Sequence, residues 1–418
     1  MSDCSSDWSQ DADFVVRRPI FNRDKTIWGY ELLANEVPTL PDGGEVISLG
    51  DLISAYQANF SRMQPDDVHD AHLFLTIPDG VHLTESNLPD GWDNCVFELC
   101  KAQTEAPGCK DFIKNFSKTG GCMAIDENVD AENARDLQDE TSIVKVSLSE
   151  RTPLEVVKIR QLHKGLDRDL MATDVSDWEA FEGTKALGFQ LFQGAFFASP
   201  NVSSDEELPI NAKAKLELLQ KLNDPNCEVD ELAVAIGSDV SLSFRFLKYI
   251  NSASFGLRNN IASIQQAVAL LGLVEVRHWA MVVLMSDMDP TPKGDELTFM
   301  ALQRARFLSQ LADSIENFPH SSDSMFLLGL FSLLDALLAF PMEQALQDMP
   351  LDPEMKAALC GDDNGLRDWI LFLEAVEDGS WEAAHKILGQ YGASYSKAAT
   401  EYMKAAAWAS CQIPELKK

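Results

Sequence analysis

The stretch Arg18-Pro19-Ile20, followed shortly by Gly29-Tyr30-Glu31-Leu32-Leu33-Ala34, opens the first half of this chain and decides its fold. Short apolar runs then recur at intervals of roughly 20 to 30 residues, the spacing of repeated strand–helix units. The strand candidates are residues 14–20, 73–77, 95–99, 121–125, 143–146, 169–172 and 189–192, with an early helix at 45–62. Their near-continuous apolar character favours a mainly parallel sheet closed into a (β/α) barrel over an open doubly wound sheet.

The second half of the chain has a different pattern. A polar, turn-rich segment at residues 201–208 is predicted to be a linker. Beyond it the strand patterns end, and amphipathic helices begin with Leu216, Leu219 and Leu222. We therefore predict an α/β plus all-α protein: a flexible acidic N-terminus at 1–13, a barrel at 14–200 and a helical domain with C-terminal helices at 209–418.

The charge balance excludes one class of partner. The chain has 66 Asp and Glu against 34 Lys and Arg, a formal net charge of −32. Such a surface repels phosphate backbones, and because no dense Lys/Arg run interrupts it, non-specific nucleic-acid binding is not expected. The N-terminus has no apolar signal segment. The longest apolar stretch, 325–340, is interrupted by Asp335 and is shorter than the roughly 20 residues of a membrane span. We therefore expect a cytoplasmic protein without membrane insertion.

The opening motif and the later strand ends resemble EAL domains, the cyclic-di-GMP phosphodiesterases of bacterial second-messenger signalling. The resemblance covers roughly residues 14–200 and implies a TIM-like (β/α) barrel. In that family a cluster of carboxylates and an Asn holds two divalent metals, which activate water for attack on a phosphodiester. The polar positions of the family pattern that this chain retains are Glu31, Glu98, Asp126, Lys145 and Gln193.

Other positions depart from the family pattern. The substituted positions are Arg18 for a Gln, Asn35 for a phosphate-gripping Arg, Thr76 for the ligand Asn, Glu127 for the second Asp of Asp-Asp-Phe-Gly, Ser147 for an Asp, and Thr173 and Ser176 for two glutamates. Asp174 is one residue out of register with a lost glutamate. On an extended strand it would point away from the pocket, and only a bulge would turn it back. The resemblance therefore implies a degenerate pocket that does not support two-metal hydrolysis.

The helical half resembles HDOD domains, which are relatives of HD-type phosphohydrolases without the metal-binding residues. The resemblance rests on Ile250-Asn251-Ser252-Ala253-Ser254-Phe255-Gly256, Leu270-Leu271-Gly272 and Phe331-Ser332-Leu333-Leu334-Asp335. An HD hydrolase needs His next to such an Asp, whereas Leu334 precedes Asp335, and Arg306 stands where a first His is expected. This half is therefore expected to be a protein-interaction module, and the whole chain resembles two-domain EAL–HDOD signalling proteins.

Three functions remain open from the sequence. The first is a catalytically inactive signalling protein that acts through a regulatory protein partner. The second is an active metal-dependent phosphodiesterase, and the third is a cyclic-di-GMP receptor without hydrolysis. The missing donors favour the first, which needs no cofactor, whereas Mg²⁺ and cyclic-di-GMP belong to the other two. The resemblance also implies a homodimer. The spacing of His69 and His72, with His82 downstream, is compatible with zinc, but the adjoining Asp66 and Asp67 favour a solvated segment.

Overall fold

The computed structural model describes most of the chain, and these residues divide into two compact units. The described residues are 14–36, 46, 48–63, 71–78, 81–83, 94–99, 101–105, 108–127, 141–149, 151–201, 210–224, 226–251 and 261–417. One unit is Asp13–Phe197 with the short segment Val376–Trp381, and the other comprises Ala198–Ala375 and Glu382–Lys418. The predicted N-terminal segment 1–13 and nearly all of the predicted linker 201–208 lie outside the described residues.

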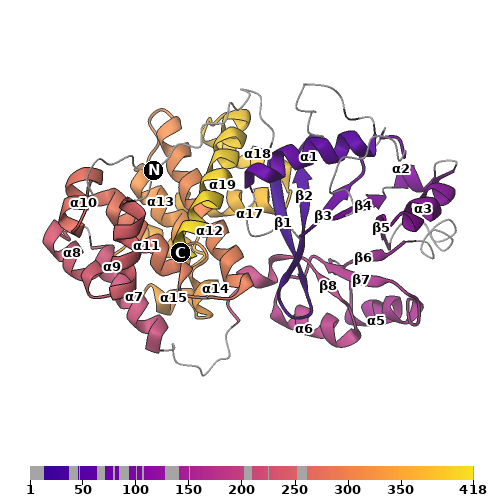
Figure 1. Cartoon of the computed structure of the whole chain (residues 1–418), viewed down its shortest axis with the longest axis horizontal. Helices are drawn as coiled ribbons and strands as arrows, with labels where there is room; N and C mark the ends of the chain where they lie inside the picture. The colour runs from indigo at the N-terminus through magenta and orange to yellow at the C-terminus, as the bar shows by residue number, and fades with distance from the viewer. Residues whose placement is uncertain are drawn as a thin grey trace. The chain divides into compact units, whose positions relative to one another are not determined.

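The first unit is a closed barrel whose strands follow one another in the order β1 to β8. These strands are Val15–Asn22 (β1), Ile27–Ala34 (β2), His72–Thr76 (β3), Cys95–Leu99 (β4), Cys122–Asp126 (β5), Ile143–Ser147 (β6), Asp169–Thr173 (β7) and Leu191–Phe192 (β8). Strands β2 to β8 run parallel, and only β1 is antiparallel to its neighbours β2 and β8. The prediction of a mainly parallel barrel is therefore confirmed (Figure 1).

The antiparallel start of the barrel is a feature that the sequence pattern did not predict. Strands β1 and β2 form a hairpin in which Arg18 lies opposite Glu31. Its turn is held by Asn22, whose side-chain oxygen accepts hydrogen bonds from the backbone N–H groups of Asp24 at 2.9 Å and Thr26 at 3.1 Å. Glu31 therefore lies on a strand of its own, between the first two predicted strands.

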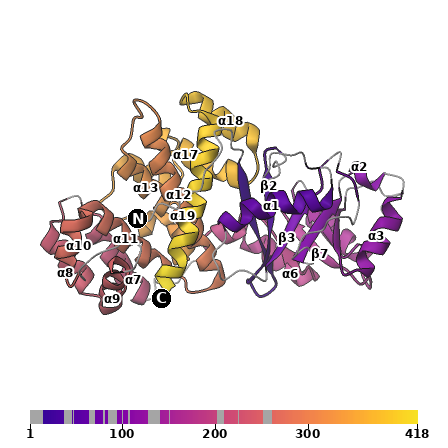
Figure 2. The same ribbon diagram turned by 45° about the horizontal axis from the view of Figure 1, so that its top comes forward.

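Helices cover the outside of the barrel. They are Leu49–Met63 (α1), Lys101–Thr104 (α2), Cys109–Lys118 (α3), Pro153–Leu162 (α5) and Trp178–Leu187 (α6), followed by a single 3-10 turn at Ala195–Ala198 (η2). The first of them confirms the helix predicted at 45–62. Both views place α1 alongside β2 and β3 (Figure 2). Helix α3 packs Phe116 against Phe97 of β4, with ring centroids 5.8 Å apart.

An apolar layer fills the inside of the barrel. It consists of Ile20, Phe74, Val96, Ala124, Ile143, Met171 and Leu191, each at most 3% exposed. Successive side chains of a strand alternate between its two faces. The residue two positions further along each strand therefore points into the barrel as well, and in the parallel strands it lies nearer the C-terminal end. This alternation places the candidate site directly above the apolar layer.

From Ile210 onward the described chain is helical. The helices are Ile210–Leu222 (α7), Val229–Gly237 (α8), Val240–Ile250 (α9), Ile264–Leu271 (α10), Leu273–Ser286 (α11), Pro292–Ser314 (α12), Ser322–Phe331 (α13), Leu334–Leu338 (α14), Met342–Ala345 (α15), Pro353–Leu359 (α16), Gly365–Glu377 (α17), Trp381–Gln390 (α18) and Tyr395–Lys417 (α19). The long helix α12 packs along α13 and α19 (Figure 1 and Figure 2). A Cβ atom at Gly329 of α13 would lie 2.5 Å from the backbone of α12, so glycine permits this close approach.

Within the described part of the chain, no single helix has both the length and the apolar composition of a membrane span. Helices α10 and α11 reach both criteria only when taken together as a sharply bent pair.

Candidate functional site

Polar side chains occupy the layer directly above the apolar core, at the mouth of the barrel. Each stands two residues beyond a core residue: Thr76 after Phe74, Glu98 after Val96, Asp126 after Ala124, Lys145 after Ile143, Thr173 after Met171 and Gln193 after Leu191. Arg18 and Glu31 join them from the hairpin. We call these residues, from Arg18 to Gln193, the mouth ring. The structure thus brings together all of the retained positions that the sequence singled out.

Lys145 is the centre of the mouth ring. Its Nζ atom donates hydrogen bonds to Oε1 of Glu31 and to Oε2 of Glu98, both at 2.9 Å. Glu31 lies on β2 and Lys145 on β6, so the first of these ion pairs spans the barrel from one side to the other. The ammonium also lies 5.0 Å from the centre of the Phe74 ring in the layer below. One buried cation therefore joins two carboxylates that are distant in sequence.

Glu31 is held in its charged form by its neighbours. It is 2% exposed, and its second oxygen accepts a hydrogen bond from Nε2 of Gln193 at 2.9 Å. The guanidinium of Arg18 approaches the same oxygen to 3.6 Å. Burial favours the neutral acid, but the charges of Lys145 and Arg18 and the two hydrogen bonds outweigh it, so the pKa of Glu31 is lowered.

Glu98 shows the opposite balance although it shares the same cation. Burial raises the pKa of Glu98, the nearby charge of Glu31 raises it further, and attraction to Lys145 offsets these effects only in part. For Lys145, burial favours the neutral amine, but the two carboxylates outweigh it and raise its pKa above the usual value. The cluster is therefore a mutually dependent buried charge network.

The two threonines of the mouth ring stand where the family has metal ligands. Thr76 donates its hydroxyl hydrogen to Oε2 of Glu98 at 2.8 Å. Thr173, at the end of β7, is 7% exposed and presents a neutral hydroxyl in place of a carboxylate. Both substitutions replace an oxygen donor of the family pattern with a hydroxyl. The hydroxyl of Thr76 is part of the carboxylate network, and that of Thr173 is part of the barrel wall.

Other substituted positions lie at the edge of the mouth ring or outside it. The side-chain oxygen of Asn35 accepts a hydrogen bond from the backbone N–H of Phe14 at 2.9 Å, where it closes the open end of the hairpin. Glu127 pairs with Arg151 at 2.6 Å. Ser176 donates to the carboxylate of Asp177, the N-cap residue of α6, at 2.7 Å. All of these partners lie within the barrel unit, and the sequence did not indicate the Arg151 partner.

Asp174 differs from the sequence expectation. Its φ of 56° lies in the left-handed region, so the chain after Thr173 does not continue as an extended strand. The carboxylate of Asp174 turns toward the neighbouring strand β6 and accepts a hydrogen bond from the hydroxyl of Ser147. Ser147 follows Lys145 by two residues on β6 and therefore faces the mouth. Asp174 thus reaches the rim of the mouth rather than pointing away from it.

The oxygen donors of the mouth ring are three carboxylates and the hydroxyls of two threonines. Mg²⁺ prefers near-octahedral oxygen coordination, part of which water or a substrate supplies, and two of the three carboxylates, Glu31 and Glu98, are hydrogen-bonded to Lys145. The hydroxyls of Thr76 and Thr173 replace an amide and a carboxylate. Among the residues that the structure describes, no group of three or more His, Cys, Asp or Glu side chains could hold a metal ion.

Arg18 is a member of the mouth ring whose role the sequence did not reveal. Its spacing of two residues from the core residue Ile20 is the signal that indicates an inward side chain. Besides its contact with Glu31, its guanidinium lies 3.4 Å from Asp378, in the segment Val376–Trp381 that belongs to the same unit. Its charge is therefore shared between two carboxylates.

The helical half has a second buried polar group, near the expected HD position. Burial raises the pKa of Asp335 to about 6. Nearby, the buried Arg304 donates to the hydroxyl of Ser332 at 3.0 Å. Arg306, where a first His is expected, lies with its guanidinium 5.6 Å from the centre of the Trp408 ring. The residues near the positions of an HD centre thus take part in packing and in local hydrogen bonds.

The remaining sequence candidates take up structural positions. His72 stacks on Trp28 with ring centroids 4.3 Å apart, and burial lowers its pKa. His69 lies outside the described residues, as does most of the HDOD motif at 250–256. Of that motif, Asn251 donates to the carbonyl of Ile261 at 2.8 Å and accepts from its N–H at 2.7 Å, so it links the end of α9 to the residues just before α10.

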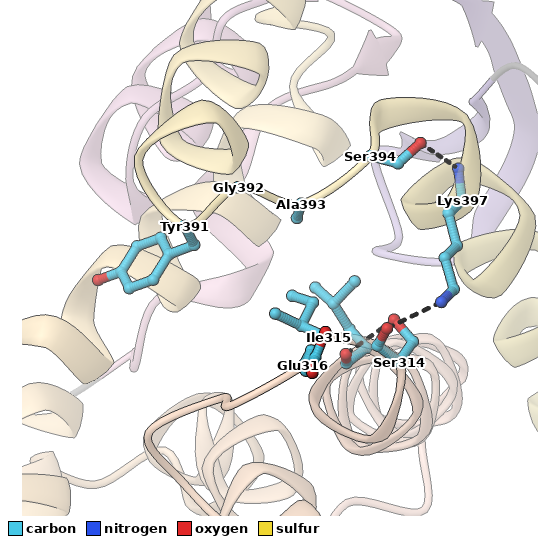
Figure 3. Close-up of a pocket in the computed structure, with 9 residues that line it drawn as sticks. Ser314, Ile315, Glu316, Tyr391, Gly392, Ala393, Ser394 and Lys397 are labelled. Carbon is cyan, nitrogen blue, oxygen red and sulfur yellow. Dashed lines mark hydrogen bonds between the residues drawn. The ribbon is translucent and has the colours of Figure 1, made fainter.

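A pocket of about 310 Å³ lies in the helical unit, between the end of α12 and the loop that joins α18 to α19. The ammonium of Lys397 points to this helix end and donates to the carbonyl of Ser314 at 2.8 Å (Figure 3). The ring of Tyr391 points away from Lys397 (Figure 3). Its hydroxyl donates to Asp368 at 2.8 Å. The hydroxyl of Tyr391 and the ammonium of Lys397 are thus engaged with the protein itself.

The class of the protein follows from these features together with one family match. Residues 208–350 match the sequence model of the HDOD domain, so the chain contains an HDOD domain there. The closed barrel before it gathers the EAL-type motif positions into one ring. The chain therefore contains an HDOD domain that follows a closed barrel, and the motif positions of this barrel resemble those of EAL domains.

Two relatives extend over almost the whole chain. The uncharacterized protein YuxH of Bacillus subtilis (strain 168) is 29% identical over 392 residues, which cover 90% of this chain and 93% of YuxH. Cyclic di-GMP phosphodiesterase CdgJ of Vibrio cholerae serotype O1 is 24% identical over 406 residues, 94% of this chain and 92% of CdgJ. Among solved structures, a standalone EAL protein of Vibrio cholerae O395 with bound c-di-GMP is 19% identical and covers 47% of this chain and 93% of its own, with a TM-score of 0.31.

Proposed function

We propose that this protein is a catalytically inactive signalling protein related to cyclic-di-GMP signalling, and that it acts by binding a regulatory protein. The relation to this messenger is supported by the similarity to CdgJ along nearly the full length of both chains. The lack of catalysis is supported chiefly by Thr76. Its hydroxyl stands at the position of a ligand amide and donates to Glu98, so it presents a donor to the carboxylate and no amide oxygen to a metal.

In this proposal the barrel serves as a scaffold. The carboxylates Glu31 and Glu98 and the ammonium of Lys145 satisfy one another in a buried network. A fully satisfied buried network holds its members in one arrangement, which suits a rigid scaffold. Both the outside of the barrel and the helical domain bind the partner, and the protein works in the cytoplasm, where the homodimer implied by the EAL resemblance is the functional form.

A receptor that binds cyclic-di-GMP without cleaving it is the less favoured alternative. Such a receptor needs a cation that can pair with a phosphate, ideally the bidentate guanidinium of an arginine. Asn35 replaces that arginine, and its side-chain oxygen is used by the N–H of Phe14. The ammonium of Lys145 is already hydrogen-bonded to two carboxylates. These contacts weaken the case for phosphate recognition at the mouth.

Calorimetry with product analysis tests the proposal. Cyclic-di-GMP is titrated into the purified full-length protein, first without divalent metal and then with Mn²⁺, and the contents of the cell are analysed for the linear dinucleotide. We expect no binding heat and no product under either condition, with a near-ultraviolet circular dichroism spectrum that confirms a folded sample. Binding without product would support the receptor instead, and metal-dependent product would overturn both.

A further inference from the structure

Helix α5 on the outside of the barrel has apolar side chains on two opposite faces. Its inner face buries Val156 and Ile159. On its outer face Leu154 is 72% exposed and Leu162 is 69% exposed, and Leu166 in the following turn is 43% exposed. A helix that is apolar on both sides normally has a partner on each. Within the described part of the chain, the barrel lies against the inner face of α5 (Figure 1).

The outer leucines form one stripe along the helix. Leu154, Lys158 and Leu162 are spaced by four residues, so they lie on the same side of α5. The two leucines are eight residues apart, which corresponds to about 12 Å along the helix axis. Leu166 extends the stripe beyond the last turn. Its length matches the contact between two short helices, in which apolar side chains recur every three or four residues.

The stripe is presented on a fixed helix rather than on a frayed one. The N-terminus of α5 has a capping box, in which Glu155 accepts hydrogen bonds from the N–H and the hydroxyl of Thr152, both at 2.7 Å. At the other end, Nε of Arg160 donates to the carbonyl of Leu187 in α6 at 2.9 Å. A partner would therefore meet these leucines with little further cost in ordering.

The segment that carries the stripe has a net charge opposite to that of the whole protein. Residues 151–168 contain five Lys and Arg but only two Asp and Glu, whereas the chain as a whole has a net charge of −32. Lys158 and Lys164 are exposed, as is Asp167, whereas Arg151 pairs with Glu127 and Arg160 donates to the carbonyl of Leu187. Glu155, the one acidic residue of α5, is turned back to cap the helix. A partner with carboxylates around its own apolar stripe would complement this surface.

We propose that the outer face of α5, with Leu166, is a docking surface for an acidic amphipathic helix of a partner protein. The inference rests on the proposed function, because it supplies the kind of partner for a protein without catalysis. A second copy of this chain packed symmetrically on the stripe would bring Lys158 against its own counterpart, which like-charge repulsion opposes. An anionic membrane would attract the local lysines but repel the remaining, strongly acidic surface.

Two labelled helical peptides test the proposal with the full-length protein. Both carry leucines at every fourth position, and they differ only in having Glu or Lys at the flanking positions. Fluorescence anisotropy at physiological ionic strength, where screening limits the influence of distant charges, measures their binding. We expect the acidic peptide to bind at least about tenfold more tightly than the basic one.

Three variants locate the binding. The double variant Leu154→Ser/Leu162→Ser should lower the affinity for the acidic peptide by about tenfold or more. The double variant Lys158→Glu/Lys164→Glu should bind the basic peptide more tightly than the acidic one. The matched control is Leu270→Ser, which changes an exposed leucine (51%) on α10 and should leave binding unchanged. All these side chains are exposed, so each variant should keep the wild-type melting temperature.

Four results would overturn the proposal. Equal binding of the two peptides would show that the charges beside the stripe do not select the partner. A loss of binding in Leu270→Ser as large as that in the α5 double variant would show that the peptide does not bind at the stripe. Self-association of the wild type that Leu154→Ser/Leu162→Ser abolishes would identify a second copy as the occupant. Binding to vesicles that contain phosphatidylserine would identify a membrane. None of these results depends on cyclic-di-GMP hydrolysis. The proposed docking surface and the proposed function can therefore be refuted independently of each other.

Discussion

The ammonium of Lys145 lies 2.9 Å from Oε1 of Glu31, across the full width of the barrel from β6 to β2. The same atom lies 2.9 Å from Glu98 on β4. One lysine therefore neutralises two carboxylates that burial would otherwise destabilise. Because a buried ion pair that loses one partner leaves an uncompensated charge, the stability of the barrel depends on this residue.

Replacement of Lys145 by methionine should destabilise the barrel by about 3 to 5 kcal/mol, because Glu31 and Glu98 would remain buried without their cation. Urea denaturation followed by circular dichroism measures the free energy of unfolding. The matched control is Lys158→Met on the exposed side of α5, which should change that free energy by less than about 0.5 kcal/mol. A similar small effect for both variants would mean that the network contributes nothing to stability.

The pH dependence of stability should depend on Glu31 in a defined direction. Its pKa is lowered in the folded state, so the unfolded chain takes up a proton first as the pH falls. The stabilisation from charged Glu31 is therefore complete above its usual pKa of 4.5 and is lost as the pH falls through the lower folded value. We expect the difference in unfolding free energy between wild type and Glu31→Gln to be large at pH 7 and to shrink below pH 4.5. A difference in unfolding free energy between wild type and Glu31→Gln that grows as the pH falls would contradict a lowered pKa of Glu31.

Asp335, in the helical half, should give a pH dependence of stability opposite in sign to that of Glu31. Its pKa rises from 3.8 to about 6, so the folded protein keeps the proton longer than the unfolded chain, and stability falls as the pH rises through 6. Such a rise corresponds to at most about 3 kcal/mol. Asp335→Asn should therefore stabilise the protein at pH 7, and the gain should disappear below the usual carboxyl pKa. A variant that is less stable than wild type at pH 7 would refute the assignment.

Gly194 should not tolerate a side chain. It has a φ of 147°, and a Cβ atom there would lie 2.3 Å from the carbonyl oxygen of Val175. Gly194→Ala should therefore destabilise the barrel by about 3 kcal/mol or more. Gly183 in the middle of α6 is the matched control, because a Cβ atom there meets nothing within 4 Å.

Thermal melts of the two variants should move in opposite directions. Gly183→Ala should stabilise the protein by about 0.5 to 1 kcal/mol, since alanine favours a helix over glycine. Equal melting temperatures for the two variants would show that the turn after Gln193 accommodates a side chain.

The barrel could be predicted from the sequence because its parallel strands are short, apolar and evenly spaced. The alternation of Ile143 and Lys145, or of Val96 and Glu98, also places the retained polar residues on the inner face. The hairpin could not be predicted from spacing. Its second strand, Ile27–Ala34, follows the first after a short turn, and the repeat pattern favours parallel units.

The rest of the site depends on tertiary structure. Whether Thr76 donates to Glu98 or faces solvent depends on the register of β3 against β4, where these two residues are direct neighbours. The position of Asp174 depends on a single left-handed residue, which a strand pattern does not reveal. The pairing of Glu127 with Arg151 joins two loops that are 24 residues apart.

Hydrolysis of cyclic-di-GMP by the purified full-length protein is the measurement that tests the central claim most directly. The protein is incubated with the nucleotide in Mg²⁺ and in Mn²⁺, and the linear dinucleotide is quantified by chromatography beside an active phosphodiesterase as the positive control. The loss of oxygen donors at Thr76 and Thr173 predicts no product above the protein-free background. Metal-dependent product that disappears in Glu31→Gln would contradict the account, because it would show that the mouth ring is a working catalytic centre.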